Sequence, residues 1–67
     1  MKGYRFITDD DTVDFCQRVT EALSSGWKLY GEPKMTFDHK RKVMRCGQAV
    51  VKQSSKKYKK AMDLAKI

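Results

Sequence analysis

The residue types that most often supply nucleophiles, general bases and zinc ligands are scarce in this sequence, which has one histidine and two cysteines. Cys46 lies on a predicted strand, seven positions after His39 in the preceding turn. At about 3.3 Å per extended residue, the two side chains are too far apart for a hydrogen bond. Together with Cys16 they give three potential zinc ligands without CxxC or HxxxH spacing, one short of a closed structural site. We therefore expect no catalytic residue, no metal and no cofactor, and interpret the protein as not being an enzyme.

A run of carboxylates, Asp9-Asp10-Asp11, is the other candidate for chemistry, because carboxylates bind divalent cations. An EF-hand loop needs spaced ligands, a central glycine and a distal glutamate, and none of these follow here. Aspartate before an apolar-periodic run is instead the usual start of a helix, where the helix dipole favours negative charge. We therefore predict that this run, with Thr12, caps a helix.

The charge of the chain is unevenly distributed, with fifteen Lys and Arg against eight Asp and Glu and a net charge of +7. Residues 1–38 hold five basic and seven acidic side chains, whereas residues 39–67 hold ten basic side chains and only Asp63. A basic half of this kind attracts polyanions, whether nucleic acid, an anionic membrane surface or an acidic protein. The alternative is that the lysines only keep a small protein in solution.

Hydrophobic periodicity predicts the elements that position these residues. Residues 4–8 alternate as a first strand, and a helix follows from about Thr12 to Ser25 and ends at Gly26. Its apolar stripe includes Cys16, which we interpret as a buried, inert thiol. Further elements are a strand at 27–30, a break at Gly31-Glu32-Pro33, an edge segment at 34–38, a basic turn at 39–42, a central strand at 43–52 and a lysine-rich helix at 55–66. That last helix could pack on the sheet, cross to a second subunit or fray.

A β-α-β-β order packs simply, with the last strand between the first two, antiparallel to both, and the helix on one face. Because burying Arg45 under the helix would be costly, we assign the Met44 side of the central strand to the helix. Small residues at Gly47 and Ala49 leave the opposite assignment open, since they would let a helix approach closely. With our choice, the other face of the sheet carries Arg5, Ile7, Lys28, Tyr30, Arg45, Gly47, Ala49 and Val51.

These elements predict one α+β domain, with a β-α-β-β core and a three-stranded, mainly antiparallel sheet over residues 1–53, and a lysine-rich helix or tail over residues 54–67. The strings YRFIT, FCQRVTEAL, GWKLYG, MTFD and MRCGQAVVK resemble the small bacterial and phage family catalogued as domain of unknown function number 1737. The resemblance implies the β-α-β-β unit and no catalytic residues, because the activity of that family is unassigned. The Asp9-Asp10-Asp11 run stands where related members tend to have a Gly-Pro pair before the acidic residues.

We expect a small non-enzymatic binding protein whose basic surface engages an anionic partner, either nucleic acid or a nucleotide or phosphate ligand. The alternative is a protein-interaction module: a homo-oligomer, or a bacterial or phage effector that inhibits a larger host protein. Candidate anion-binding residues are Arg5, Lys28, Tyr30, Lys40, Arg41, Lys42, Arg45, Lys56, Lys57, Lys59 and Lys60. Candidate residues of an oligomer or partner interface are Ile7, Tyr30, Ala49, Val51, Tyr58 and Met62.

The predicted compartment is the cytoplasm, because two cysteines are too few for a disulfide framework and the first residues contain no apolar signal region. The longest aliphatic run, Ala49-Val50-Val51, is far short of the ~20 apolar residues that a membrane helix needs, so we expect no membrane span. A chain of 67 residues has a small core, and self-association into a dimer would help to stabilise it.

Overall fold

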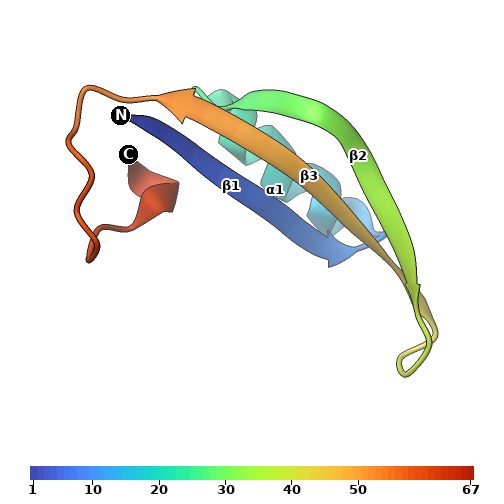
Figure 1. Cartoon of the computed structure of the whole chain (residues 1–67). Coiled ribbons are helices and arrows are strands. Elements are labelled where there is room, and N and C mark those ends of the chain that lie inside the picture. Colours follow the sequence, from blue (N-terminus) through green and yellow to red (C-terminus); the bar gives the residue numbers. More distant parts are fainter.

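The computed structural model describes all 67 residues as one three-stranded sheet with a helix on one face (Figure 1). The elements are β1 (Lys2–Asp10), α1 (Val13–Ser24), β2 (Lys28–Asp38) and β3 (Val43–Gln53), followed by one 3-10 turn at Leu64–Lys66. The strand order is β1-β3-β2, and β3 is antiparallel to both of its neighbours. The predicted α+β class, the β-α-β-β order and the central position of the last strand are confirmed.

Helix α1 begins and ends where backbone conformation changes. Thr12 is the N-cap residue, as predicted, and its backbone is extended, but its side chain makes no capping hydrogen bond. Asp9 and Asp10 belong to β1 instead. At the other end Gly26 has a φ of +92°, a left-handed conformation that glycine reaches without strain, and Trp27 donates its backbone N–H to the carbonyl of Ala22.

The core lies between α1 and the middle of the sheet. Val50, on the central strand, is fully buried, and Ile7 and Trp27 are each 2% exposed. Ala22 of α1 completes this cluster with Ile67, while Phe15 and Val19 pack against its edge. The prediction that Cys16 is buried is wrong, because its side chain lies outside this contact and is exposed. The helix therefore buries only a narrow stripe.

The register of β1 decides which of its side chains face the helix. Arg5 lies opposite Val50 and Ile7 opposite Gln48, whereas Phe6 lies opposite Ala49. Directly opposed residues of antiparallel strands point to the same face, so Arg5 and Ile7 lie on the helix side and Tyr4 and Phe6 on the other. The predicted faces of β2 and β3 are right, and the predicted face of β1 is wrong, because the apolar residue that fills the core is Ile7.

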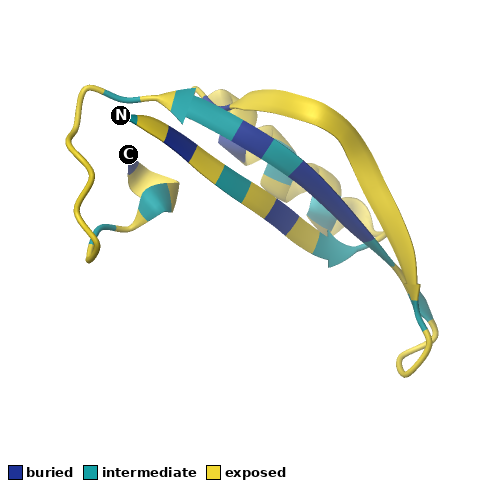
Figure 2. Ribbon diagram, in the orientation of Figure 1, coloured by how far each residue is buried: buried dark blue, intermediate teal, exposed yellow.

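Strands β2 and β3 form a long bent hairpin. The register shifts between Tyr30 and Lys34, where Gly31 adopts a φ of +73° and Gln48 donates a side-chain hydrogen bond to its carbonyl. The predicted break at Gly31-Glu32-Pro33 is therefore a bulge within one strand. Beyond β1 the hairpin continues to the turn at residues 39–42, and β2 is exposed along nearly its whole length (Figure 2).

The segment after β3 does not form the predicted lysine-rich helix. Only Leu64–Lys66 makes a single 3-10 turn. Lys56, Lys57, Lys59 and Lys60 would be like-charged neighbours three and four residues apart on a helix, and such pairs are destabilising. Instead, Ile67 enters the core beside Gly3 and Trp27, while Met62 and Leu64 pack against the cluster. None of the helices has the length and apolar character required to cross a lipid bilayer.

Candidate functional site

The sheet face turned away from α1 is not covered by any element, and we call it the open face (Figure 1). The strand registers place on it the side chains of Tyr4, Phe6, Thr8 and Asp10 from β1, Lys28, Tyr30, Lys34, Thr36 and Asp38 from β2, and Val43, Arg45, Gly47, Ala49 and Val51 from β3. This set differs from the predicted one at β1, where Tyr4 and Phe6 replace Arg5 and Ile7.

Three aromatic side chains are exposed on the open face. Phe6 and Tyr30 flank Ala49 from opposite sides, since both are its cross-strand neighbours. Tyr4 lies two residues from Phe6 along β1, opposite Val51. All three side chains are at least half exposed. The sequence predicts only Tyr30 here, because it assigns Tyr4 and Phe6 to the opposite face of β1.

A pocket of about 350 Å³ lies on the open face beside Phe6. This volume falls at the lower end of the range of about 300–1,000 Å³ that small-molecule sites occupy. The pocket combines one aromatic ring, two cationic side chains and two threonine hydroxyls. Its lining residues are Phe6, Thr8, Lys34, Met35, Thr36, Arg45, Cys46 and Gly47.

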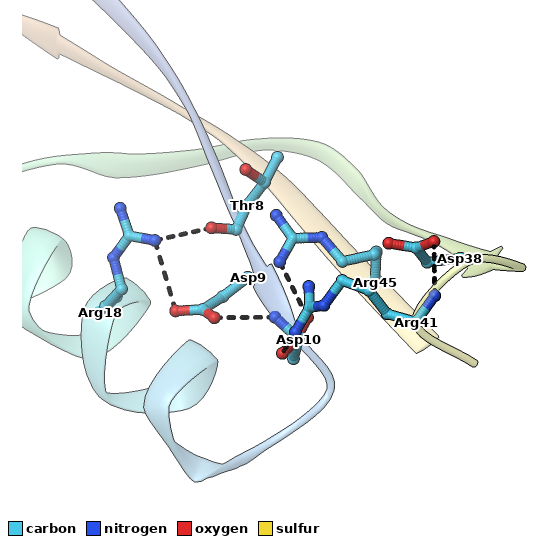
Figure 3. A network of polar contacts seen from close by, with 7 residues as sticks. All are labelled: Thr8, Asp9, Asp10, Arg18, Asp38, Arg41 and Arg45. Carbon is cyan, nitrogen blue, oxygen red and sulfur yellow. Dashed lines mark hydrogen bonds and ion pairs between the residues drawn. The ribbon is translucent and has the colours of Figure 1, made fainter. Parts of the chain in front are cut away.

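Asp10 holds two of the predicted anion-binding arginines (Figure 3). Arg41 binds its carboxylate through both guanidinium nitrogens, at 3.0 and 2.6 Å, and Nη1 of Arg45 lies 2.9 Å from Oδ1. These hydrogen bonds lower the pKa of Asp10 below its ordinary value, and the bond from Arg41 has the largest effect. The hydrogen bond between Arg41 and Asp10 also raises the pKa of Arg41. Two guanidinium groups against one carboxylate leave the Asp10–Arg41–Arg45 cluster with a net positive charge, and the carboxylate of Asp38 lies close to Arg41.

A second ion pair fixes the edge of β1. Nη1 of Arg18, from α1, donates to the backbone carbonyl of Thr8 at 2.6 Å and lies 3.4 Å from the carboxylate of Asp9 (Figure 3). Asp9 and Asp10, two of the aspartates that were predicted to cap a helix, thus act as partners for arginines.

The other predicted cations do not converge on one place. Arg5 lies on the helix side, with its guanidinium 5.3 Å from the centroid of the Trp27 ring. Lys40 and Lys42 lie in the β2–β3 turn, and the lysines of the last segment, Lys56, Lys57, Lys59 and Lys60, lie near the opposite end of the molecule (Figure 1). Of the predicted cations, only Lys28 and Arg45 belong to the open face, and Lys34 is one that the sequence prediction missed.

The predicted interface residues are also divided. Tyr30, Ala49 and Val51 lie on the open face, and Tyr58 is exposed on the last segment. Ile7 is part of the core and presents no surface to a partner, which corrects its predicted role. Met62 packs partly against the core.

The thiols and the histidine lie in unlike surroundings. Cys46 is buried, and this burial raises the pKa of its thiol. The negative charge of nearby Asp11 raises the same pKa further. Cys16 is exposed. His39 lies in the turn with its ring edge against Phe37, 5.0 Å between centroids. No group of three or more His, Cys, Asp or Glu side chains is placed to hold a metal ion.

Comparison with known proteins gives one family. The sequence model of the family described as Domain of unknown function (DUF1737) matches residues 1–53. No curated protein and no solved structure matches the chain. The matched segment contains the helix α1 and all three strands, which is the part of the chain that carries the resemblance drawn from the sequence. The chain belongs to the DUF1737 family.

Proposed function

We propose that this protein is a non-catalytic binding domain whose open face holds single-stranded nucleic acid. The observation that carries the proposal is the presence of Tyr4, Phe6 and Tyr30 on one uncovered sheet face, each at least half exposed. Stacking of a base on an aromatic side chain contributes about 1–3 kcal/mol and tolerates any base, because every base has a π-face. Sheet-based single-strand readers use this arrangement.

Unpaired lysines beside these rings support the same proposal. Lys28 lies opposite Val51, two residues from Tyr30 on the same face, and Lys34 borders the pocket beside Phe6. The ion pairs of the chain involve Arg18, Arg41 and Arg45, so neither lysine is neutralised by a carboxylate. These two ammonium groups are the candidates for contacts with phosphates, which supply most of the affinity and make it salt-dependent. Lys40 and Lys42 lie further away, in the turn that follows β2.

A non-catalytic role agrees with the state of the thiols. A thiolate is the reactive form of cysteine, and burial raises the pKa of Cys46, which keeps this thiol protonated. His39 lies in the turn against Phe37, and the neighbouring carboxylate of Asp11 raises the pKa of the Cys46 thiol further. The activated pair of nucleophile and base that covalent catalysis needs has no counterpart here.

The experiment is fluorescence anisotropy with labelled single- and double-stranded RNA and DNA oligonucleotides at low and at physiological salt. Tyr30→Ala and Tyr58→Ala form a matched pair, because the two tyrosines are 60% and 62% exposed but only Tyr30 lies on the open face. We expect Tyr30→Ala to weaken single-strand binding by about 1–3 kcal/mol, with Tyr58→Ala close to wild type.

Two outcomes would contradict the proposal. One is an equal loss of affinity in both tyrosine variants, which would remove the open face from the binding surface. The other is binding that ignores strandedness and disappears at physiological salt, which would reduce the interaction to attraction between net charges.

A further inference from the structure

The two edge strands of the sheet, β1 and β2, differ in whether other parts of the chain hydrogen-bond to or pack against their outer sides. On β1, Arg18 donates a hydrogen bond to the carbonyl of Thr8, and the carboxylate of Asp9 accepts one from the backbone N–H of Asp10. The last segment of the chain packs beside the same strand. On β2, the backbone from Lys34 to Phe37 makes no hydrogen bond on its outer side, and Figure 2 shows this strand exposed. An unprotected edge strand is a template for pairing with another chain.

The same stretch of β2 carries apolar side chains that α1 does not reach. Met35 is 56% exposed and Phe37 43%, and both lie on the helix side of the sheet beside Met44 of β3. The hairpin continues past the end of β1, where Asp10 is paired with Arg45, so Phe37 and Met44 lie beyond that strand. Exposed apolar side chains beside an open edge are typical of an interface.

We propose that residues 34–38 of β2 pair antiparallel with the same residues of a second copy, with Thr36 on the two-fold axis. The side chains of a strand alternate between its two faces, so the helix sides of both sheets lie on one face only if odd-numbered residues oppose odd-numbered ones and even-numbered residues oppose even-numbered ones. In the proposed register Met35 lies opposite Phe37 of the second copy, and Phe37 opposite its Met35. On the helix side of the joined sheet, the junction is then lined by these methionine and phenylalanine side chains on both sides of the axis.

Charge complementarity selects this register and identifies the occupant as another copy of the chain. Lys34 falls opposite Asp38 of the second copy, and Asp38 opposite its Lys34, and neither residue takes part in an ion pair within the chain. A shift of two residues in one direction puts Glu32 opposite Asp38, and the opposite shift puts Lys34 opposite Lys40. Like charges directly opposed across strands are destabilising, so both neighbouring registers are disfavoured.

The proposed contact is isologous and closes on itself, which gives a dimer and not a filament. It uses the outer edge of β2 and leaves the open-face rings uncovered, but it shares Lys34 with the proposed phosphate contacts, so self-association and nucleic-acid binding are measured separately. Because the two sheets become one, the open faces of both copies lie on the same side of the joined sheet.

Disulfide cross-linking tests the register directly. Thr36→Cys in a Cys16→Ser background brings two identical positions to a Cα separation of about 4.5–5.5 Å, within disulfide range. Lys34→Cys in the same background is the matched control, since its two copies would be about 13 Å apart at ~3.3 Å per residue along the strand. We expect rapid covalent dimer with Thr36→Cys and none with Lys34→Cys. A reversed or equal pattern would overturn the proposal.

Charge reversal tests the complementarity. Lys34→Glu and Asp38→Lys each replace two opposite-charge pairs with two like-charge pairs, and we expect each to weaken self-association by about tenfold or more in sedimentation experiments. Mixing the two variants restores an opposite pair at both places, so a heterodimer is expected with affinity near that of the wild type. Asp38 also accepts backbone hydrogen bonds from Lys40 and Arg41, so the unfolding midpoint of each variant is measured first. Wild-type protein that stays monomeric at hundreds of micromolar, or mixing that gives no heterodimer from folded variants, would overturn the proposal.

Discussion

The ring of Phe6 lies across Gly47 on the neighbouring strand, in the space that the Cβ atom of any other residue would occupy. Cε2 of Phe6 would be 2.8 Å from that Cβ, and Cζ closer still. The missing side chain of Gly47 therefore leaves room for the outer edge of the ring to lie close to the backbone, beside the pocket of the open face. The glycine has no positive φ to explain it, so its role is this close approach.

Gly47→Ala should displace the Phe6 ring and so weaken single-strand binding without unfolding the protein. The ring is half exposed and can turn into solvent, so we expect a stability change below about 1 kcal/mol. The loss of affinity should approach that of Phe6→Ala. A double-mutant cycle by anisotropy checks this, because Gly47→Ala should have almost no effect once Phe6 is alanine. Additive effects would contradict the relationship.

Val50→Ala should be among the most damaging aliphatic truncations in the sheet. Val50 is fully buried at the centre of the core, and its truncation leaves a cavity, so we expect a loss of about 2 kcal/mol in the free energy of unfolding. Val13→Ala is the matched control, because Val13 is 66% exposed at the start of α1 and alanine favours helix. Urea titrations measure both, and similar midpoints in the two variants would place the core elsewhere.

Ile67→Ala should destabilise the whole domain even though the residue lies outside the segment that the family model matches. Ile67 is 8% exposed and touches the core cluster, so we expect a loss of about 2 kcal/mol, at the low end for such truncations. Tyr58→Ala, in the exposed part of the same segment, should leave the thermal midpoint unchanged. Equal midpoints for both variants and wild type would mean that the segment does not contribute to the core.

Asp10→Asn should remove a pH-dependent part of the stability. The pKa of Asp10 is lowered from 3.8 by the hydrogen bonds of Arg41 and Arg45, so its stabilising contribution is fully present above about pH 4 and is lost as the pH falls through the lowered native value. The difference in thermal midpoint between wild type and Asp10→Asn should therefore shrink as the pH falls below 3.8. Asp14→Asn is a control, because Asp14 forms no ion pair. A difference that stays constant down to pH 2 would contradict the assignment.

The same Asp10→Asn variant should bind nucleic acid more tightly. Loss of the carboxylate releases Arg41 and Arg45, which adds one unit of positive charge at the turn end of the open face. We expect a steeper dependence of affinity on salt, by about 0.7 in the slope for single strands. Anisotropy at several salt concentrations measures this slope, and an unchanged slope would place the bound strand away from the turn.

The strand order and the helix were predictable because their signals are strong. Gly26 ends α1, Pro33 marks the irregular part of β2, and the long run from Val43 has only one place in a β-α-β-β sheet. Arg45 correctly identified the solvent side of β3, since a buried guanidinium needs a partner, and here it has Asp10 on the open face.

The face of β1 was not predictable from alternation, because Tyr4 to Ile7 places large apolar side chains on both sides of the strand. An arginine next to them favours the solvent side, yet Arg5 lies on the helix side at the margin of the core, over Trp27, with its guanidinium group still accessible. The signal that was overlooked is Gly47, since a glycine inside a strand indicates that something packs closely against that face.

The lysine-rich segment is fixed at both ends. Ser54 donates its backbone N–H to the carbonyl of Met1 at 2.7 Å, and Ile67 is inserted in the core. The lysines between these points thus belong to a closed loop, which has already lost much of the chain entropy of a free tail. An anionic partner that contacts them would have less disorder to remove, and the separation of these charges from β1 is set by the fold.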